Sequence, residues 1–366
     1  MNKKFIVWQL KRWIVPLAIF LGVIVLMFGL SVISIVTTFD GGAIYQIESG
    51  NSISTLSLLQ TPIFVAILLA AIFPIVVFSY KFGMQRCDFY NQLPFRPKEF
   101  KRTIMILGLV AILAVIIVGY GLGASIFAIF YALSPATKTI NYFGFVIEGA
   151  TKINLDWTAI FYGLLYLIVI CAASYFISSC IVYNNIGVFE SIICIVLFHI
   201  AASSAVMVVQ TRLVIHEIIE SYDAISFGII PMIAYSSMFD SLLTEGNIEV
   251  GKEFYISCGI YIALAAGGFI WTWLEKDRSA EVDNTKGEPK AFPIIVLHAG
   301  MLFGTGLIAA LILQLGLPVL GLVMWALCMV VYFFLNVLYK HGFGLEMKQW
   351  LPMIPIVAAT FALCFF

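Results

Sequence analysis

The side chains that could do chemistry in this chain are few, and most lie within long apolar runs. Glu190 and His199 are ionisable residues of one such run. An ionisable group inside an apolar helix is a candidate for moving protons or ions. Burying its charge in the membrane costs free energy, so such groups are rare there and usually serve a function. The nine-residue separation of the two puts them on nearly opposite faces of a helix. We therefore expect them not to form a relay with each other.

Other patterns associated with chemistry fit less well. Residues 246–252 have the spacing of a phosphate-binding P-loop, but Glu253 replaces the Ser or Thr that binds magnesium, and no apolar strand precedes it. Gly119, Gly121 and Gly123 approximate a dinucleotide loop, yet they lie inside an apolar run, where small residues let helices approach closely. Paired carboxylates, a catalytic triad and metal-ligand spacings are not found. We expect no catalytic residue, no metal site and no cofactor bound by this chain.

Composition identifies the elements that must hold these residues. The 366 residues are 62% hydrophobic and 11% charged, far below the charged fraction of about 25% in globular proteins. A membrane-spanning helix needs about 20 mostly apolar residues, and the alternating pattern of β-barrel strands is absent. The chain is predicted to be an all-α polytopic membrane protein. Nine runs are candidate spans: 13–37, 60–80, 103–134, 157–182, 189–210, 254–274, 294–315, 318–339 and 350–366.

A polar stretch that contains Gly and Pro, 275–293, divides these runs into six and three. The predicted organisation is a six-span core at 1–274, a cytoplasmic linker at 275–293 and a C-terminal three-span extension at 294–366. The third run is longer than a bilayer requires, so it should tilt or project. The stretch 224–239 is apolar but broken by Gly228 and Pro231. It predicts short re-entrant helices, with an ordinary packed outer loop as the alternative.

The placement of the basic residues predicts the orientation. The chain has 20 Lys and Arg residues and 20 Asp and Glu residues, yet only Lys138, Lys152, Arg212 and Lys252 fall on the side opposite the N-terminus. The positive-inside rule therefore places the N-terminus of this multi-pass protein in the cytoplasm. A nucleic-acid partner is not expected, because no basic patch lies on a folded soluble face.

The most informative connection between predicted spans is residues 81–102, KFGMQRCDFYNQLPFRPKEFKR. Its first part, 85–92, can form about two helical turns that end at the following prolines, and 98–102 should restart a helix into the third span. A short helix with aromatic residues at its tip and basic flanks suits docking of a soluble partner. The alternative is a positively charged turn that serves topology only. The candidate contact residues are Arg86, Asp88, Phe89, Tyr90, Asn91, Leu93 and Pro94.

These features together resemble the permease subunits of bacterial ABC transporters of the second exporter class, which have the type V fold. The resemblance rests on the basic, Trp-containing stretch 3–13, on Asp-Phe-Tyr-Asn-Gln-Leu-Pro at 88–94, and on the broken segment before the sixth span. In related Gram-positive permeases Ser is common where Gln92 stands. Their Arg-Ser-x-Glu and Ala-Phe linker elements are matched at 278–281 and 291–292. The three spans after the usual six depart from the pattern.

The resemblance implies that a separate cytoplasmic nucleotide-binding ATPase subunit binds ATP and Mg, and that two permeases assemble as a homodimer or a heterodimer. Segment 85–94 would be the coupling helix that docks on the ATPase. The expected function is export of hydrophobic or amphipathic cargo, an antimicrobial or cytolytic peptide or a lipid, across the bacterial plasma membrane. The residues expected to help close the outer end are Phe227, Ile230, Pro231 and Met232.

Two other classes of function remain open from the sequence. A secondary transporter driven by an ion gradient would work without an ATPase, and it would have inverted repeats and charged residues at the membrane midplane. A non-transporting peptide sensor or immunity protein of the membrane would bind peptides at the acidic outer loop. A flux assay separates that class from the transporters.

Overall fold

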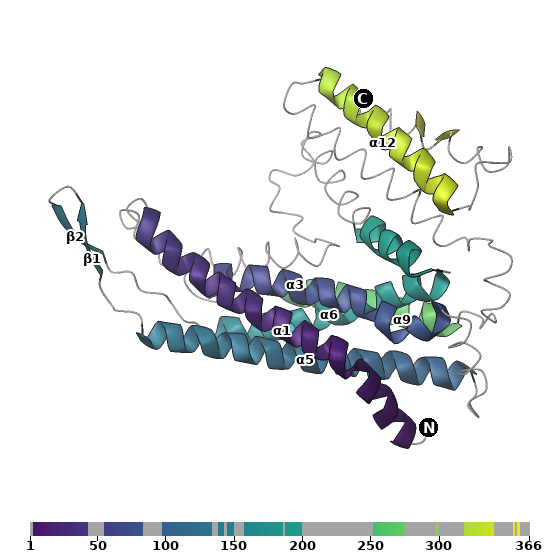
Figure 1. Ribbon diagram of the computed structural model, residues 1–366, viewed down its shortest axis with the longest axis horizontal. Helices are drawn as coiled ribbons and strands as arrows, with labels where there is room; N and C mark the ends of the chain where they lie inside the picture. Colours follow the sequence, from purple (N-terminus) through teal and green to yellow (C-terminus); the bar gives the residue numbers. More distant parts are fainter. Residues whose placement is uncertain are drawn as a thin grey trace. The chain divides into compact units, whose positions relative to one another are not determined.

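The computed structural model describes residues 3–42, 55–82, 97–133, 138–142, 145–149, 157–185, 187–199, 252–274, 298, 318–339, 354–355 and 357–358. Most of these residues are helical (Figure 1). A helix without a label in Figure 1 spans Val188–His199. The labelled helices and the 3-10 helix η1 are α1 (Lys3–Gly42), α3 (Thr55–Val77), η1 (Ser79–Phe82), α5 (Pro97–Leu133), α6 (Trp157–Asn184), α9 (Lys252–Leu274) and α12 (Pro318–Tyr339).

The helices coincide with the predicted apolar runs wherever the structure describes them. α5 has 37 residues, which confirms that the third run is longer than a bilayer needs. Within the described ranges, three segments are long and apolar enough to cross a membrane: Lys4–Ser31, Lys98–Ile129 and Ile160–Asn184. These three helices indicate a membrane-embedded protein.

The predicted division into six and three spans stays a prediction. The runs at 294–315 and 350–366 lie almost entirely outside the described residues, and so do the linker 275–293 and the predicted re-entrant segment 224–239. The fifth run, 189–210, is described only as far as His199, where it is helical.

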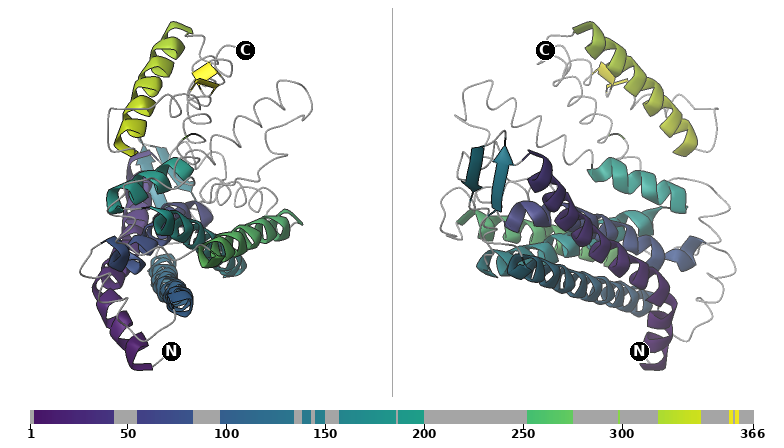
Figure 2. Two further views of the ribbon diagram at one scale, coloured as in Figure 1. Left: turned by 90° about the vertical axis from the view of Figure 1, so that its right-hand side faces the viewer. Right: turned by 60° about the vertical axis from the view of Figure 1, so that its left-hand side comes forward.

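The expectation of a helical chain is confirmed for the described residues, with one short antiparallel hairpin as the exception. β1 (Lys138–Tyr142) pairs with β2 (Phe145–Gly149) (Figure 2). In this pairing Tyr142 lies opposite Phe145. Two connecting residues, Phe143 and Gly144, separate the strands in the sequence. Short runs with β-branched and aromatic residues, separated by two residues that include Gly, are a typical hairpin signal. A search for spans alone passes over this signal, because neither run is long enough to cross a membrane.

The internal contacts divide the chain into two compact units. The first contains α1, α3 up to Phe73, α5 from Thr103, the hairpin, α6 up to Tyr175 and α9 up to Ala266. The second contains the end of α3, η1, the start of α5, the end of α6, the Val188–His199 helix, the end of α9, and α12. Four of the boundaries in the sequence, at 73/74, 102/103, 175/176 and 266/267, therefore fall inside helices.

Aromatic rings and tyrosine hydroxyls join the helices of the first unit. The buried ring of Phe73 in α3 meets Trp13 of α1 at 5.9 Å and Tyr175 of α6 at 6.5 Å between ring centroids. The Tyr175 hydroxyl donates to the backbone carbonyl of Met105 in α5 at 2.9 Å. Tyr120 of α5 donates to the carbonyl of Ile160 in α6 at the same distance. α5 and α6 are thus joined by hydrogen bonds at two levels.

α1 packs on α5 through a glycine position. A Cβ atom added at Gly123 would lie 2.4 Å from ring atoms of Phe28, and one at Gly119 would lie 2.8 Å from Ile24. The Phe28 ring is held edge-on to Tyr120 at 6.0 Å, so it cannot swing aside freely. The expectation that the glycines of 119–123 serve helix contact is confirmed for Gly119 and Gly123. Gly121 faces open space.

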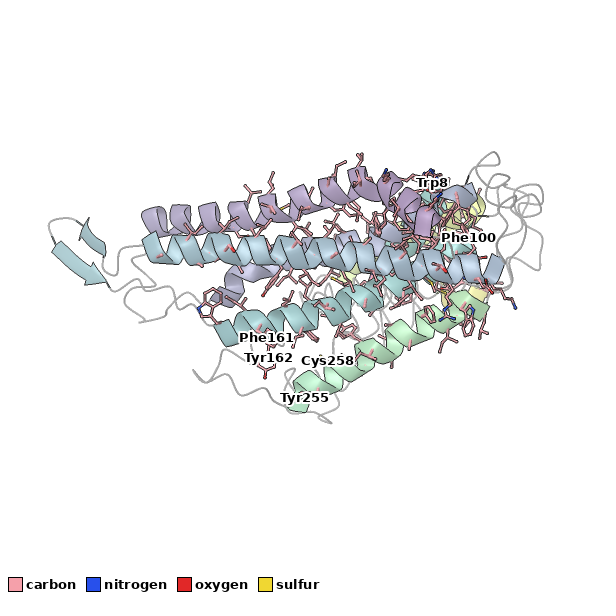
Figure 3. All side chains as sticks on the ribbon, turned by 90° about the horizontal axis from the view of Figure 1, so that it is seen from below. Trp8, Phe100, Phe161, Tyr162, Tyr255 and Cys258 are labelled. Carbon is pink, nitrogen blue, oxygen red and sulfur yellow. The ribbon has the colours of Figure 1, made fainter. Side chains whose placement is uncertain are left out.

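The N-terminal stretch that carries part of the resemblance is helical and continuous with α1. Pro16 lies inside this helix, and α1 bends in its N-terminal part (Figure 1), as expected where proline removes a backbone hydrogen bond. Within the stretch, the guanidinium of Arg12 lies 5.0 Å from the Trp8 ring centroid. Trp8 is partly exposed (Figure 3).

In the second unit, α9 approaches the backbone of α6 without a side chain between them. A Cβ atom at Gly268 would lie 2.9 Å from the carbonyl carbon of Phe176, whereas Gly267 has nothing within 4 Å. The rings of Phe176 and Phe269 meet edge-on at 5.4 Å. Small residues that bring helix backbones together are the usual means of helix association in lipid.

Gly268→Ala should lower the free energy of unfolding by about 1–3 kcal/mol, because the added methyl group overlaps backbone atoms that cannot rotate away. Gly267→Ala is the matched control, and it should leave stability unchanged or raise it by up to about 1 kcal/mol through helix propensity. Unfolding of the full chain in mixed micelles measures both. Equal effects of the two substitutions would contradict the close contact between α6 and α9.

Candidate functional site

The predicted contact residues of the 85–94 segment lie outside the described residues, but the structure describes both of its flanks. η1 ends at Phe82 before the segment, and α5 begins at Pro97 after it. The helix predicted to restart at 98–102 is confirmed, with Pro97 as its first residue. Proline suits this position because the first N–H groups of a helix have no acceptor within the helix, so the missing N–H breaks no hydrogen bond. Glu99 in the first turn is stabilised by the positive end of the helix dipole. Also outside the described residues are Arg86, Asp88, Phe89, Tyr90, Asn91, Leu93, Pro94, Phe227, Ile230, Pro231 and Met232.

Lys81, on the flank before the segment, caps the end of α6. Its Nζ donates hydrogen bonds to the backbone carbonyls of Tyr183 and Asn185, the latter at 3.4 Å. The last carbonyls of a helix have no partner within the helix and carry the negative end of its dipole. A lysine ammonium supplied from another element therefore stabilises the end of α6.

Lys101, on the flank after the segment, meets the same residue. Its Nζ lies 4.4 Å from the centroid of the Tyr183 ring, and the Nζ of Lys81 lies 4.7 Å from that centroid. An ammonium group within about 6 Å of an aromatic ring is attracted by its negative face, and more strongly where water is excluded. Lys101 is only 1% exposed. Tyr183 thus supplies part of the stabilisation that a buried cation requires.

Aromatic rings connect the same elements. Phe78, the residue after α3, is fully buried and meets Tyr183 edge-on at 5.7 Å. Phe100, labelled in Figure 3, lies in the first turn of α5. Its ring meets that of Tyr80 in η1 edge-on at 5.6 Å. Edge-on pairs at these separations are the favoured geometry for aromatic side chains. We call the following residues the flank cluster: Phe78, Tyr80, Lys81, Phe100, Lys101 and Tyr183.

Two asparagines close the last turn of α6 beside the flank cluster. Asn184 Nδ2 donates to the carbonyl of Cys180 at 2.9 Å, and Asn185 Nδ2 donates to that of Ile181 at 3.0 Å. Both side chains are buried. These bonds reach back four residues along the helix, so the end of α6 is held by its own side chains as well as by Lys81.

Glu190, predicted as an intramembrane polar candidate, lies in the first turn of the Val188–His199 helix. Its Oε2 accepts a hydrogen bond from the backbone N–H of Gly187 at 3.1 Å, and Ser191 donates to the Gly187 carbonyl at 2.7 Å. A glutamate that reaches back to the N–H of the residue three before it is one half of a capping box. Its charge also faces the positive end of the helix dipole. Helix capping accounts for the presence of Glu190.

His199, the second polar candidate, lies at the last described residue of the same helix. It is partly buried, and its ring lies 5.8 Å from that of its neighbour Phe198. Glu190 and His199 therefore occupy opposite ends of the described helix.

A different histidine, His298, forms a hydrogen bond between its Nδ1 and the Tyr332 hydroxyl of α12. Tyr332 is buried against Leu197 and its α12 neighbours, which joins α12 to the Val188–His199 helix.

The contacts of the flank cluster hold the end of α6 and the start of α5 in place. The described part of the chain gathers no group of three or more His, Cys, Asp or Glu side chains that could hold a metal ion. Sequence reasoning counted Lys81 and Lys101 as basic residues of the segment and missed Tyr183 and Tyr332. A tyrosine near the end of a span is a weak signal, because tyrosine is enriched at membrane interfaces in general.

Comparisons with known proteins assign no family. No family model, curated protein or solved structure matches the chain. The resemblance to ABC permeases therefore rests on the residues quoted for it.

Glu190→Ala should lower the free energy of unfolding by about 1 kcal/mol, which is the usual cost of losing a helix cap. Glu190→Gln should keep most of the stability, because a glutamine side chain also accepts the hydrogen bond of a capping box. Chemical unfolding of both variants in mixed micelles measures the difference. A glutamine variant as unstable as the alanine variant would show that the charge of Glu190, rather than its hydrogen bond, matters.

Proposed function

We propose that the chain is the transmembrane permease subunit of an ABC exporter in the bacterial plasma membrane, with its N-terminus in the cytoplasm. The exporter moves hydrophobic or amphipathic cargo, a peptide or a lipid, out of the cell. A separate cytoplasmic ATPase subunit binds ATP and Mg and supplies the energy. A second permease, identical or related, completes the pathway.

Residues 83–96, which lie between η1 and α5 and contain the predicted coupling helix 85–94, are called the 83–96 segment. The observation that carries this proposal is the attachment of both flanks of this segment to one helix end. A segment that receives force from a soluble partner must be firmly attached to the helices that it moves, because slack at its ends would absorb the displacement. Lys81 before the segment and Lys101 after it both contact Tyr183 at the end of α6. A connection that only sets the orientation in the membrane needs positive charges but no specific contacts. Lys101 is buried, which the orientation does not require.

The ion-driven alternative depends on ionisable groups that can exchange ions in the membrane. Glu190 is engaged with the N–H of Gly187 as a helix cap, which accounts for this carboxylate without ion exchange. His199 remains as a candidate of that kind. The contacts of the flank cluster favour energy input through the 83–96 segment.

Replacement of both Phe89 and Leu93 by Asp should reduce co-purification of ATP-hydrolysing activity with the tagged full chain at least about 30-fold. That factor corresponds to the loss of about 2 kcal/mol at an interface hot spot. The control carries Phe89→Leu and Leu93→Met, which keep both side chains apolar, and it should retain most of the activity. Purification from the native membrane followed by measurement of ATP hydrolysis per permease tests both.

Unchanged co-purification in the double Asp variant would contradict docking through this segment. A wild-type preparation that hydrolyses no ATP, while cargo flux in vesicles follows an imposed ion gradient, would replace the proposal by the secondary transporter. Binding of peptide at the outer face without flux would replace it by the sensor or immunity protein.

A further inference from the structure

Tyr183 is the residue at which the two flanks of the 83–96 segment meet. Lys81 precedes the segment and Lys101 follows it, and both ammonium groups lie within 5 Å of the centroid of its ring. Lys81 also binds the backbone carbonyl of Tyr183. One residue of α6 therefore contacts the chain on both sides of the segment, through its ring and through its backbone.

Both cations lie against the shared ring. Two ammonium groups that face the same ring repel each other, and the repulsion grows as water is excluded. The negative face of the ring and the carbonyls at the end of α6 offset this repulsion. Because Tyr183 supplies this compensation to both cations, a displacement of Tyr183 removes it from both flanks at once. We expect the two flanks to move together for this reason, and to carry the end of α6 with them.

The end of α6 is stiff enough to transmit such a displacement. Asn184 and Asn185 bond to carbonyls one turn earlier in the helix. Phe78, the residue after α3, packs against the Tyr183 ring. A displacement at Tyr183 is therefore passed to the helix as a whole, because its last turn cannot unwind without breaking these contacts.

From this geometry we infer that Tyr183 is the positioning residue that ties the 83–96 segment to α6, and that α6 is the helix that receives the motion of the segment. The attachment itself needs no ATPase. The statement that the motion comes from ATP hydrolysis rests on the proposed function. The two parts are tested separately.

The attachment is tested by limited trypsin digestion of the purified full chain, in which cleavage after Arg86 is followed by mass spectrometry. Tyr183→Leu keeps an apolar side chain but loses the aromatic face, and it should raise the initial cleavage rate about tenfold, the factor expected for loss of a partly desolvated cation–π contact. Tyr183→Phe keeps the ring and should cleave at the wild-type rate. Equal rates in all three proteins would overturn the attachment, and so would equal increases in both variants.

A second pair of variants tests the attachment from the other side of the contact. Lys101→Met removes the cation and should reproduce the fast cleavage of Tyr183→Leu, whereas Lys101→Arg keeps a cation that can lie on the ring and should resemble the wild type. This pair decides the question if Tyr183→Leu fails to fold. Fast cleavage in Lys101→Arg, or slow cleavage in Lys101→Met, would overturn the role of the cation.

The transmission of motion is tested in the complex with the ATPase, reconstituted in vesicles. Tyr183→Leu should leave the amount of bound ATPase as in the wild type but reduce cargo export per ATP hydrolysed at least about fivefold, whereas Tyr183→Phe should restore the wild-type ratio. A defect of folding alone would lower the amount of bound ATPase together with total cargo export. An unchanged ratio in Tyr183→Leu would overturn the assignment of α6 as the receiving helix.

The tests separate failure of the inference from failure of the proposed function. If the wild-type chain binds no ATPase, the proposed function fails, while the trypsin rates still decide whether Tyr183 holds the segment. If the wild-type complex exports cargo but the trypsin rates do not differ, the proposed function stands and the role of Tyr183 is wrong.

Discussion

Helices in a bilayer gain little by burying apolar surface against one another, because lipid tails are as apolar as their side chains. Their association depends instead on close van der Waals contact and on hydrogen bonds between helices, and the described contacts of this chain are of those kinds. The Phe28 ring occupies the space over Gly123, Gly268 meets the backbone at Phe176, and tyrosine hydroxyls join α5 and α6. α6 takes part in two of these three, and 72% of its most apolar stretch is buried, compared with 11% for the first candidate span.

At the ends of the helices the constraint is different, because carbonyls without helical partners and charged side chains must be satisfied there. Lys81 binds the last carbonyls of α6, and this contact satisfies both the carbonyls and the lysine charge. The charge of Lys101 is stabilised in part by the Tyr183 ring, on which its ammonium group lies. The positive-inside rule describes such lysines only as a statistical excess of charge on one side of a membrane. In this chain the same residues make specific contacts, which give the flanks of the 83–96 segment a defined position.

Much of the helical architecture could be predicted, since long apolar runs leave the backbone no other way to satisfy its hydrogen bonds in lipid. α5 and α6 follow their runs closely, whereas the hairpin at 138–149 was missed because its signal is local and short. The cap formed by Glu190 could have been found, since Gly187 and Glu190 have the spacing of a capping box. The meeting of Lys81 and Lys101 at Tyr183 could not, because Lys81 and Tyr183 are 102 residues apart and only the packing of three helices brings them together.

The close contact at Gly268 connects the end of α6, where the flank cluster lies, to α9. Phe176 precedes Tyr183 by about two helical turns, or roughly 10 Å along α6. At that level the backbones of α6 and α9 touch directly. Contact between backbones leaves no flexible side chain to absorb a displacement, and packed interiors transmit strain because they are nearly incompressible. A shift of the end of α6 should therefore carry the adjoining part of α9 with it, so that the two helices respond to the 83–96 segment as a pair.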